Sequence, residues 1–301
     1  MRVAVIGAGT MGSGIAQLTA MAGHETALVD LDERQLERAL SGIAQSLERF
    51  VRKEKIDADE SAAVRARLRT TTQLAEGVAG ADVVIESVIE VLDVKQAVFR
   101  QVVEHAPVDA LLGTNTSQLS ITSIGAAIPK DAHRLVGMHF FNPPVMMRLV
   151  ELVAGLESSE EAIQRAVDFG EALGKETVVC RKDSPGFLTS RISALVRLEC
   201  LRMLEEGVAS PGDIDKALRV GFNWPMGPLE LGDFNGLDTY LHILGSLEDT
   251  LGDRFKPTVT LRNLVAAGRL GRKTGHGIYA YDESGKKVED SGSSDHSGSI
   301  R

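Results

Sequence analysis

The most informative stretch of the sequence is Arg2-Val-Ala-Val-Ile-Gly7-Ala-Gly9-Thr10-Met11-Gly12, because it joins a predicted strand to a predicted helix through a glycine-rich turn. Gly7 permits the tight turn, Gly9 lets the backbone come close to a phosphate, and Gly12 allows the helix to pack against the strand. The free N–H groups and positive dipole end of a helix N-terminus attract the pyrophosphate of a dinucleotide. The sequence therefore predicts a dinucleotide-binding turn made of Gly7, Gly9, Thr10, Met11 and Gly12.

The acidic residue Asp30 ends the next predicted strand, Glu25-Thr-Ala-Leu-Val-Asp30, at a distance typical of a residue that accepts hydrogen bonds from a ribose diol. Its carboxylate would repel the 2′-phosphate of NADP, and Asp32 adds a further negative charge. Arg34 is the only nearby basic residue that could contact such a phosphate, and a solvated place in the following helix explains it better. We therefore expect NAD as the cofactor.

Length and composition limit the class of protein. The chain has 301 residues, 43% of them hydrophobic, which indicates about two domains with a sizeable core. Its net charge of −9 argues against nucleic-acid or anionic-membrane binding, which needs a broad basic surface. Cys180 and Cys200 lie in apolar segments without metal-ligand spacing and predict buried thiols in a reducing compartment. With no signal peptide or membrane-spanning run apparent, we expect a cytoplasmic protein.

The first half of the chain alternates strands and helices, which predicts an α/β fold with a doubly wound parallel sheet. Two charged amphipathic helices, roughly 33–55 and 58–69, form a long helical hairpin before a strand at 82–86. The later elements expected in this half are a helix at 93–105, the segment 111–117, strands at 134–141 and 149–153, a helix at 160–173 and a strand at 176–180.

Beyond Ser184-Pro-Gly186 the pattern becomes helical, with helices expected at 187–206, 211–220, 228–247 and 258–267. Ser210 followed by Pro211 is a typical helix start. We predict a Rossmann-type domain over 1–183 and an all-helical C-terminal domain over 184–283. The segment 284–301, rich in Ser, Gly, Asp and Lys, predicts a disordered tail.

The segment His139-Phe-Phe-Asn142-Pro-Pro follows a predicted strand at the carboxyl edge of the sheet, where open α/β sheets bind ligands. A dehydrogenase that oxidises an alcohol must remove the hydroxyl proton, and histidine titrates in the range for this role. Glu151 is an acid within an apolar strand and needs a buried partner. If Glu151 pairs with His139, it would fix the tautomer of the histidine ring and stabilise the imidazolium. Spacing alone leaves a purely structural role for His139 equally open.

Further motifs stand in a defined order along the chain: Gly7–Gly12, Asn115-Thr-Ser117, His139-Phe-Phe-Asn142-Pro, Leu149-Val-Glu151, Asp183-Ser-Pro-Gly-Phe187, Pro225-Met-Gly-Pro228 with Glu230, and Gly271-Arg-Lys-Thr-Gly275. In this order they resemble the L-3-hydroxyacyl-CoA dehydrogenases, above all the bacterial 3-hydroxybutyryl-CoA dehydrogenases, over residues 2–281. The resemblance implies NAD-dependent, metal-free, reversible oxidation of an L-3-hydroxyacyl-CoA, of short chain such as 3-hydroxybutyryl-CoA. It also implies a substrate cleft between the two domains and a homodimer formed by the helical domain.

The resemblance assigns roles to individual residues. His139 matches the catalytic histidine and Glu151 the glutamate paired with it, while Ser117 and Asn142 would orient and polarise the reacting oxygen. Three residues match positions near the cofactor: Glu90, Lys95 and Lys273. Ser190 stands where the family often has asparagine, and its shorter side chain weakens or removes a direct bond to the substrate.

An acidic protein that binds the polyanion CoA requires a local basic patch. Arg49, Arg52 and Lys53 fall at i, i+3 and i+4 of the first hairpin helix and share one face. The resemblance also brings this hairpin to the nucleotide end of CoA, so we expect these residues to contact the substrate. A solvated face balanced by Glu48 and Glu54 explains them equally well.

Three other functions remain open: a dehydrogenase like L-gulonate dehydrogenase, one that acts on carrier-protein thioesters, and a crystallin-like dinucleotide-binding protein without activity. The Phe140-Phe141 pair and the helical hairpin favour a CoA thioester over a sugar acid. The intact His139, Glu151 and Ser117 argue against a non-catalytic protein.

Overall fold

The computed structural model describes residues 1–288, and the chain divides into two compact units, Met1–Leu188 and Thr189–Arg301. Most of the predicted tail, residues 289–301, lies outside the described residues. Residues 284–288, which we expected to be disordered, belong to a turn in which the Asp282 N–H donates to Lys286 O and the Val288 N–H donates to Ala280 O, both at 2.9 Å. No helix in the described part of the chain is long and apolar enough to cross a bilayer.

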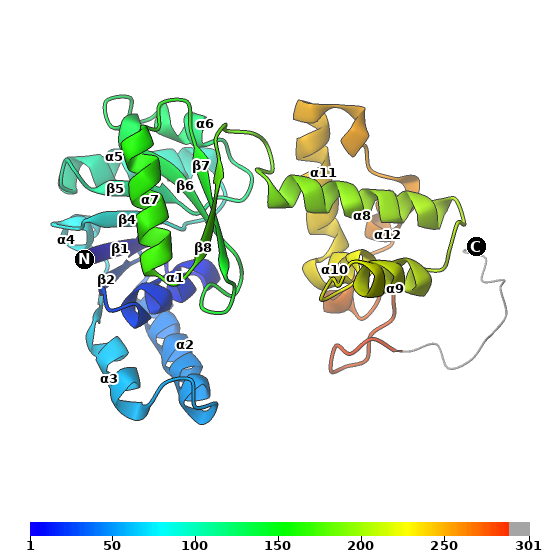
Figure 1. The fold of residues 1–301 in the computed structure, drawn as a ribbon, viewed down its shortest axis with the longest axis horizontal. Helices are drawn as coiled ribbons and strands as arrows, with labels where there is room; N and C mark the ends of the chain where they lie inside the picture. Colours follow the sequence, from blue (N-terminus) through cyan, green and yellow to red (C-terminus); the bar gives the residue numbers. More distant parts are fainter. Residues whose placement is uncertain (289–301) are drawn as a thin grey trace. The chain divides into compact units, whose positions relative to one another are not determined.

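The first unit is built on one sheet of eight strands in the order β3-β2-β1-β4-β5-β6-β7-β8 (Figure 1). The strands are β1 (Arg2–Ile6), β2 (Glu25–Val29), β3 (Leu68–Thr71), β4 (Val83–Glu86), β5 (Leu111–Thr114), β6 (Leu135–Phe140), β7 (Leu149–Ala154) and β8 (Glu176–Cys180). Strands β1 to β6 pair in parallel, which confirms the predicted Rossmann-type sheet.

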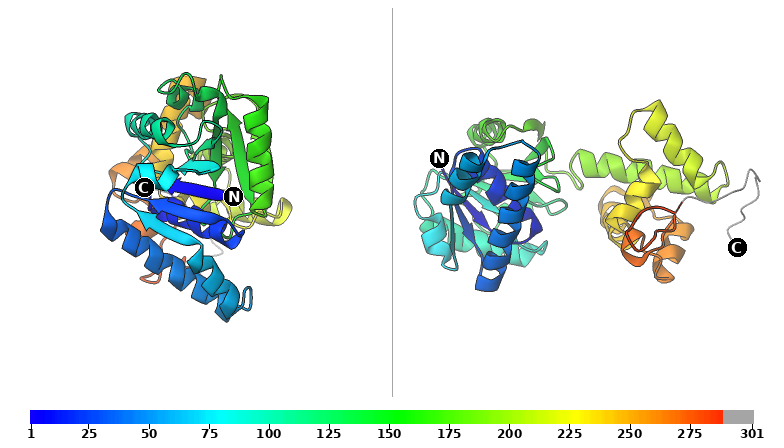
Figure 2. Two further views of the ribbon diagram at one scale, coloured as in Figure 1. Left: turned by 90° about the vertical axis from the view of Figure 1, so that its left-hand side faces the viewer. Right: turned by 90° about the horizontal axis from the view of Figure 1, so that it is seen from below.

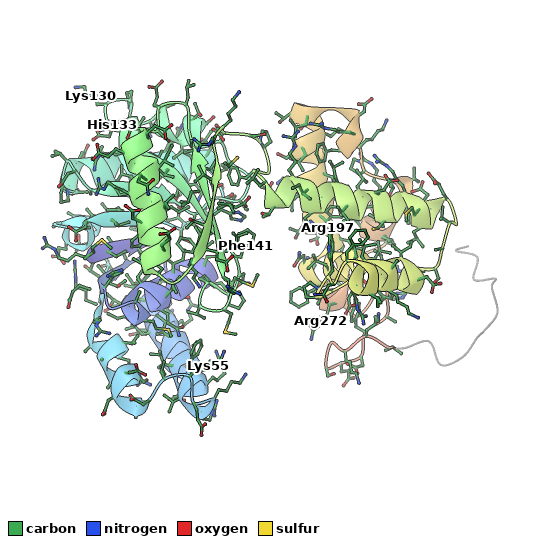
Figure 3. All side chains as sticks on the ribbon, viewed as in Figure 1. Lys55, Lys130, His133, Phe141, Arg197 and Arg272 are labelled. Atoms are coloured by element: carbon green, nitrogen blue, oxygen red, sulfur yellow. The ribbon has the colours of Figure 1, made fainter. Side chains whose placement is uncertain are left out.

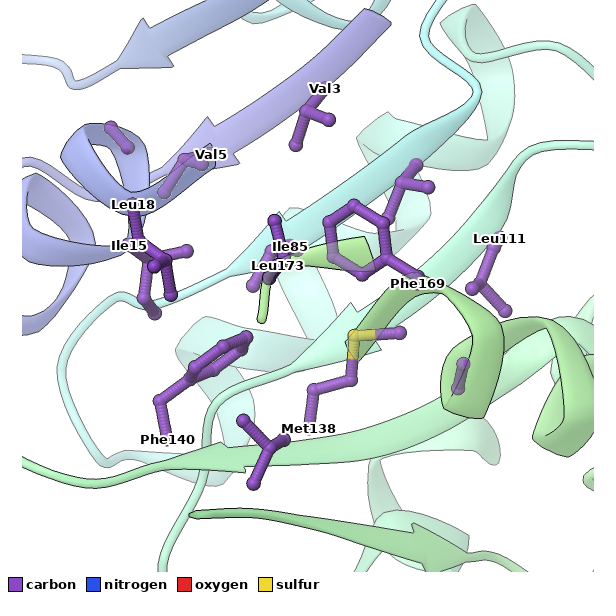
Figure 4. Close-up of a cluster of buried hydrophobic side chains, with 14 of the residues drawn as sticks. Val3, Val5, Ile15, Leu18, Ile85, Leu111, Met138, Phe140, Phe169 and Leu173 are labelled. Atoms are coloured by element: carbon purple, nitrogen blue, oxygen red, sulfur yellow. The ribbon is translucent and has the colours of Figure 1, made fainter. Parts of the chain in front are cut away.

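Helices cover both faces of the sheet because successive strand residues point to opposite sides. Val3 and Val5 of β1 pack with Ile15 of α1 (Thr10–Met21) and Phe169 of α7 (Glu160–Ala172) on one face (Figure 4). Ala4 and Ile6 join the opposite cluster, which three further helices cover. These are α4 (Leu74–Val78), α5 (Leu92–His105) and α6 (Ile121–Gly125).

The expectation of a wholly parallel sheet is wrong at one edge. Strand β7 runs antiparallel to β6, and β8 is parallel to β7. Only residues 141–148 connect β6 to β7, and a connection this short cannot make the crossover that a parallel pair needs. The antiparallel pairing sets residues of β6 and β7 directly opposite each other, which determines which side chains meet in the candidate site.

The predicted helical hairpin is present as α2 (Glu33–Arg52) and α3 (Ala58–Ala66), which project from the β2–β3 side of the sheet (Figures 1 and 2). Both helices end earlier than predicted, and Leu68–Thr71 forms the edge strand β3 instead of the end of a helix. Asp57 and Glu60 form a reciprocal capping box that starts α3. Ile43, Leu47 and Val64 pack against Ala20 of α1 and fasten the hairpin to the sheet domain.

The second unit is helical, as predicted. Its helices are α8 (Thr189–Glu205), α9 (Pro211–Gly221), α10 (Pro228–Asn235), α11 (Leu237–Leu251) and α12 (Val259–Ala266). The single helix expected over 228–247 is wrong: Gly236, with φ of 96°, separates α10 from α11. The unit has its own core around Leu198, Tyr240 and Phe255.

Candidate active site

His139 and Glu151 form a buried pair because the antiparallel register places them directly opposite each other on β6 and β7. His139 Nδ1 lies 2.7 Å from Glu151 Oε2, with Glu151 fully buried and His139 8% exposed. An ionised carboxylate only accepts hydrogen bonds, so the chemistry of the pair assigns the proton to Nδ1 and leaves Nε2 as the acceptor nitrogen. The ring is thereby held in the tautomer that a general base requires.

Aromatic rings and one backbone amide support the His139–Glu151 pair. The His139 ring centroid lies 4.5 Å from that of Phe141 and 5.8 Å from that of Phe187. Phe141 follows the end of β6 and is labelled in Figure 3. The Leu188 N–H donates to Glu151 Oε1 at 3.0 Å, so both carboxylate oxygens accept hydrogen bonds. Packing and hydrogen bonding therefore fix both side chains before any substrate arrives.

Ser117 and Asn142 come from neighbouring loops at the carboxyl ends of β5 and β6, which pair in parallel. The Ser117 N–H donates to Glu90 Oε1 at 2.9 Å. The turn after Asn142 is held by Lys175, whose Nζ donates to Pro144 O and Met147 O at 2.7 Å each. Burial lowers the pKa of this lysine. The sheet thus brings the loops of the two predicted substrate-orienting residues to the edge where His139 lies.

The glycine turn has the features that a pyrophosphate requires. Gly7 has φ of 100°, and a Cβ there would lie 2.5 Å from Ser87 O, while a Cβ on Gly12 would overlap Gly7 O. A Cβ on Gly9 would meet no protein atom within 4 Å. No side chain caps the N-terminus of α1, whose first residues are Thr10 and Met11. Open space and free backbone amides therefore coincide where a phosphate would bind.

Asp30 lies just after β2 and contacts the same turn. Its Oδ2 accepts a hydrogen bond from the Ala8 N–H at 2.7 Å, and its Oδ1 accepts one from the Asp32 N–H at 3.1 Å. The side chain remains partly exposed, so its oxygens can accept further hydrogen bonds from a ribose. The turn and this carboxylate together fit NAD. Arg34 is exposed in the first turn of α2, as expected.

Lys95, predicted to line the cofactor site, is fully buried in α5. Its Nζ lies 2.8 Å from Glu86 Oε1 and 3.3 Å from Glu90 Oε2. Glu90, the other predicted residue, is partly exposed and accepts a hydrogen bond from the Ser117 N–H. A direct role of either in cofactor binding stays a prediction. Sequence analysis did not identify Glu86, although an acid at the end of an apolar strand is the signal that singled out Asp30.

Two predicted residues belong to the helical unit. Ser190 is the second residue of α8 and is half-buried. Lys273 lies in a short 3-10 helix, Arg272–Thr274, where its Nζ contacts both carboxylate oxygens of Asp238 at 2.6 and 2.7 Å. The hydrogen bond from Lys273 lowers the pKa of Asp238. Lys273 therefore has a partner of its own, and its contact with the nucleotide stays a prediction.

The basic residues Arg49, Arg52 and Lys53 are exposed at the C-terminal end of α2. Lys55 follows at the tip of the hairpin, as Figure 3 shows, with its Nζ 5.6 Å from the Phe50 ring. A hollow of about 500 Å³ opens between α2 and α3 beside this patch. Its lining combines three aliphatic side chains with one serine, one carboxylate and two guanidinium groups: Val51, Ala58, Ala62, Ser61, Glu48, Arg52 and Arg65. Sequence reasoning missed Arg65, because its proximity to Arg52 depends on the hairpin closing.

Comparison with known proteins gives one consistent result. Residues 2–184 match the family profile of the 3-hydroxyacyl-CoA dehydrogenase NAD-binding domain, and residues 186–281 match the C-terminal domain of the same family. The chain is 42% identical over 288 residues to a probable 3-hydroxyacyl-CoA dehydrogenase of Caenorhabditis elegans. The aligned region covers 93% of this chain and 92% of that protein.

Bacterial relatives are similarly close. A probable 3-hydroxybutyryl-CoA dehydrogenase of Deinococcus radiodurans is 40% identical over 283 residues, covering 93% of this chain and 100% of the relative. The crystal structure of (S)-3-hydroxybutyryl-CoA dehydrogenase from Ralstonia eutropha superposes with a TM-score of 0.90 at 38% identity, over 94% of this chain and 99% of that one. Similarity therefore extends over both units.

Proposed function

The chain belongs to the 3-hydroxyacyl-CoA dehydrogenase family, and we propose that its substrate is a short-chain L-3-hydroxyacyl-CoA such as 3-hydroxybutyryl-CoA. Family membership makes it an NAD-dependent oxidoreductase that interconverts 3-hydroxyacyl-CoA and 3-oxoacyl-CoA. The preference for a short chain rests on relatives named for 3-hydroxybutyryl-CoA. The observation that carries the chemistry is the 2.7 Å contact between His139 Nδ1 and Glu151 Oε2 at the carboxyl edge of the sheet.

His139 is the proposed proton carrier. In the oxidation direction its Nε2 accepts the proton of the substrate hydroxyl, and in the reduction direction it returns this proton to the new alkoxide oxygen. Glu151 stabilises the imidazolium formed in between, and its burial strengthens this interaction because water does not screen it. Ser117 and Asn142 hold the reacting oxygen by hydrogen bonding. Bound NAD supplies the hydride acceptor.

The proposed cofactor site consists of the glycine turn and Asp30, and it favours NAD over NADP. The open space beside Gly9 and the uncapped start of α1 support binding of the pyrophosphate. Asp30 is an acceptor for the ribose hydroxyls and repels an added 2′-phosphate. Glu90, Lys95 and Lys273 are proposed from family resemblance alone.

The nucleotide end of CoA is proposed to bind at the hairpin. Arg49, Arg52 and Lys53 supply positive charge, and the hollow between α2 and α3 lies beside it. Guanidinium groups suit phosphates because their planar donor pattern matches phosphate oxygens. Ser190 is proposed to face the substrate through a weaker contact than the asparagine common in the family.

A homodimer formed by the helical unit is also proposed. Its support is a set of large apolar side chains on that unit which are more than half exposed: Ile192, Val208, Val220, Phe222, Phe234 and Val259. A cytoplasmic location is proposed from Cys180 and Cys200, which are both buried thiols and suit a reducing compartment.

The proposed substrate is tested by following NADH oxidation in parallel with acetoacetyl-CoA, a carrier-protein-bound acetoacetyl thioester, and free oxo acids including a sugar acid. We expect acetoacetyl-CoA to give the highest kcat/KM by a wide margin. In the reverse assay, L-3-hydroxybutyryl-CoA should reduce NAD and the D isomer should not. Higher efficiency with the carrier-bound thioester or with a free acid would exclude the proposed substrate.

A further inference from the structure

A chain of ion pairs runs through the interior of the sheet domain to the loop that carries Ser117. Glu86, Lys95 and Glu90 make it up, and we call it the Glu86–Lys95–Glu90 chain. Lys95 Nζ lies 2.8 Å from Glu86 Oε1 and 3.3 Å from Glu90 Oε2. Glu86 and Lys95 are both fully buried, whereas the Glu90 side chain is 36% exposed. The Glu86–Lys95–Glu90 chain therefore begins inside the core and ends at the surface of the site.

Glu86 is tied to the sheet at the inner end of this chain. It is the last residue of β4, and the parallel register sets it beside Thr114, the last residue of β5. Its Oε2 accepts a hydrogen bond from Thr114 Oγ1 at 2.6 Å, and its Oε1 accepts one from the Val88 N–H at 2.7 Å. With no exposed surface, Glu86 cannot touch substrate or cofactor.

Glu90 organises the Ser117 loop at the outer end. Its Oε1 accepts hydrogen bonds from Thr116 Oγ1 at 2.5 Å, from the Ser117 N–H at 2.9 Å and from the Gln118 N–H at 3.3 Å. Thr116 Oγ1 accepts in turn from the Leu119 N–H at 2.9 Å. The loop between β5 and α6 has no regular secondary structure of its own. One carboxylate oxygen therefore sets the backbone course on both sides of Ser117.

The charges explain why Glu86 matters to a loop that it does not touch. A buried ammonium group is tolerated only with a charged partner, and removing one member of a buried ion pair is strongly destabilising. Glu86 neutralises the charge of Lys95 inside the core, so the carboxylate of Glu90 is not needed to balance that charge. Without the charge of Glu86, Lys95 would have Glu90 as its only anionic contact and would draw it inward.

We infer that Glu86 is a positioning residue: by neutralising Lys95 it leaves Glu90 free to hold the Ser117 loop in its active conformation. The role of Ser117 in this inference rests on the proposed function. The test is Glu86→Gln, which keeps the size of the side chain and an acceptor oxygen but removes the charge. We expect kcat for acetoacetyl-CoA reduction to fall by about 10- to 100-fold, because a small displacement of a reacting group has effects of this size. The KM values should change little.

Amide hydrogen exchange gives a readout that needs no catalysis. In Glu86→Gln, the peptide covering residues 115–120 should exchange faster than in the unmodified protein, because the Ser117 and Gln118 amides lose their acceptor. If the unmodified protein does not reduce acetoacetyl-CoA, the proposed function fails, and the exchange rate alone still decides whether Glu86 positions this loop.

Asp131→Asn is the matched control. Asp131 pairs with buried Arg134 at 2.8 Å, just before β6 begins, and neighbouring Lys130 and His133 lie far from Phe141 in Figure 3. This change also weakens the ion pair of a buried side chain, so it should lower Tm while kcat and the exchange of residues 115–120 stay as in the unmodified protein.

A second variant keeps the test decisive if Glu86→Gln folds poorly. Glu86→Gln combined with Lys95→Met leaves no unpaired buried charge and no ammonium group to draw Glu90 inward. Exchange at residues 115–120 in this double variant should therefore return towards that of the unmodified protein, so the effects of the two changes are not additive. Unchanged kcat with only a lower Tm in Glu86→Gln, unchanged exchange at 115–120 in Glu86→Gln, or fast exchange at 115–120 in the double variant would overturn the inference.

Discussion

Asp30 does two things with one carboxylate. It accepts a hydrogen bond from the Ala8 N–H within the glycine turn. It also places a negative charge where we expect the adenine-side ribose of a dinucleotide. The first contact orders the turn, and the second is proposed to discriminate between NAD and NADP. A change at this residue should therefore affect cofactor preference more than the maximal rate.

We expect Asp30→Ala to reduce the preference for NAD(H) over NADP(H), measured as the ratio of kcat/KM values, by about tenfold, which corresponds to the loss of roughly 1.4 kcal/mol of discrimination. Glu33→Gln is the control, since Glu33 is an exposed acid nearby in the first turn of α2. It should leave the ratio unchanged. Equal efficiency with both cofactors in the unmodified protein would refute the role of Asp30.

Individual residues differ in how far the sequence reveals them. His139 and Glu151 stand out because a histidine before Asn-Pro-Pro and an acid in an apolar strand are unusual, and the structure places them in contact. Glu86 did not stand out, because its contact with Lys95 and the burial of both side chains arise only when the fold packs α5 against β4. Burial of a charged residue depends on three-dimensional packing, which local patterns do not report.

Among the elements, strand and helix positions in the sheet domain follow from hydrophobic periodicity, whereas strand direction does not. The apolar run of β7 would read the same in either direction, yet its antiparallel course is what sets Glu151 opposite His139. The edge strand β3 was missed because its four residues follow directly on α3 and are only partly buried. The division of α10 from α11 depends on one glycine, Gly236, which a helix can also tolerate.

The hairpin of α2 and α3 carries a prediction at the same scale. Replacing Arg52 and Lys53 together by Ala should raise the KM for acetoacetyl-CoA by about tenfold, with little change in kcat, because hydrogen bonds to charged groups contribute about 1.5–3 kcal/mol. Acetoacetyl-pantetheine, which lacks the nucleotide, should be nearly insensitive to the change. Steady-state kinetics with both thioesters measure this.

The control for the hairpin is Arg100→Ala with Lys130→Ala, which removes two exposed positive charges elsewhere on the sheet domain. It should leave both KM values unchanged and so separates a local contact from the effect of net charge. The hairpin is not the CoA site if both thioesters respond equally to the Arg52 and Lys53 changes, or if neither does.

At the scale of the whole molecule, the sheet domain contains most of the proposed machinery. The glycine turn after β1, Asp30 after β2, the Ser117 loop after β5 and His139 on β6 all lie towards the carboxyl ends of parallel strands. The family profiles cover this unit and the helical one, so both units belong to the dehydrogenase family. Within the sheet domain, cofactor binding and proton transfer are assigned to different residues and should be separable.

His139→Ala tests whether cofactor binding and proton transfer are separate. The rate of NADH oxidation with acetoacetyl-CoA should fall by about 10²–10⁴-fold, since a positioned general base contributes this much. NADH affinity, measured by fluorescence titration of the same preparation, should stay unchanged. His105→Ala, at an exposed histidine of α5, should keep full activity. A His139→Ala protein that retained most of its activity, or that lost NADH binding together with turnover, would contradict the account.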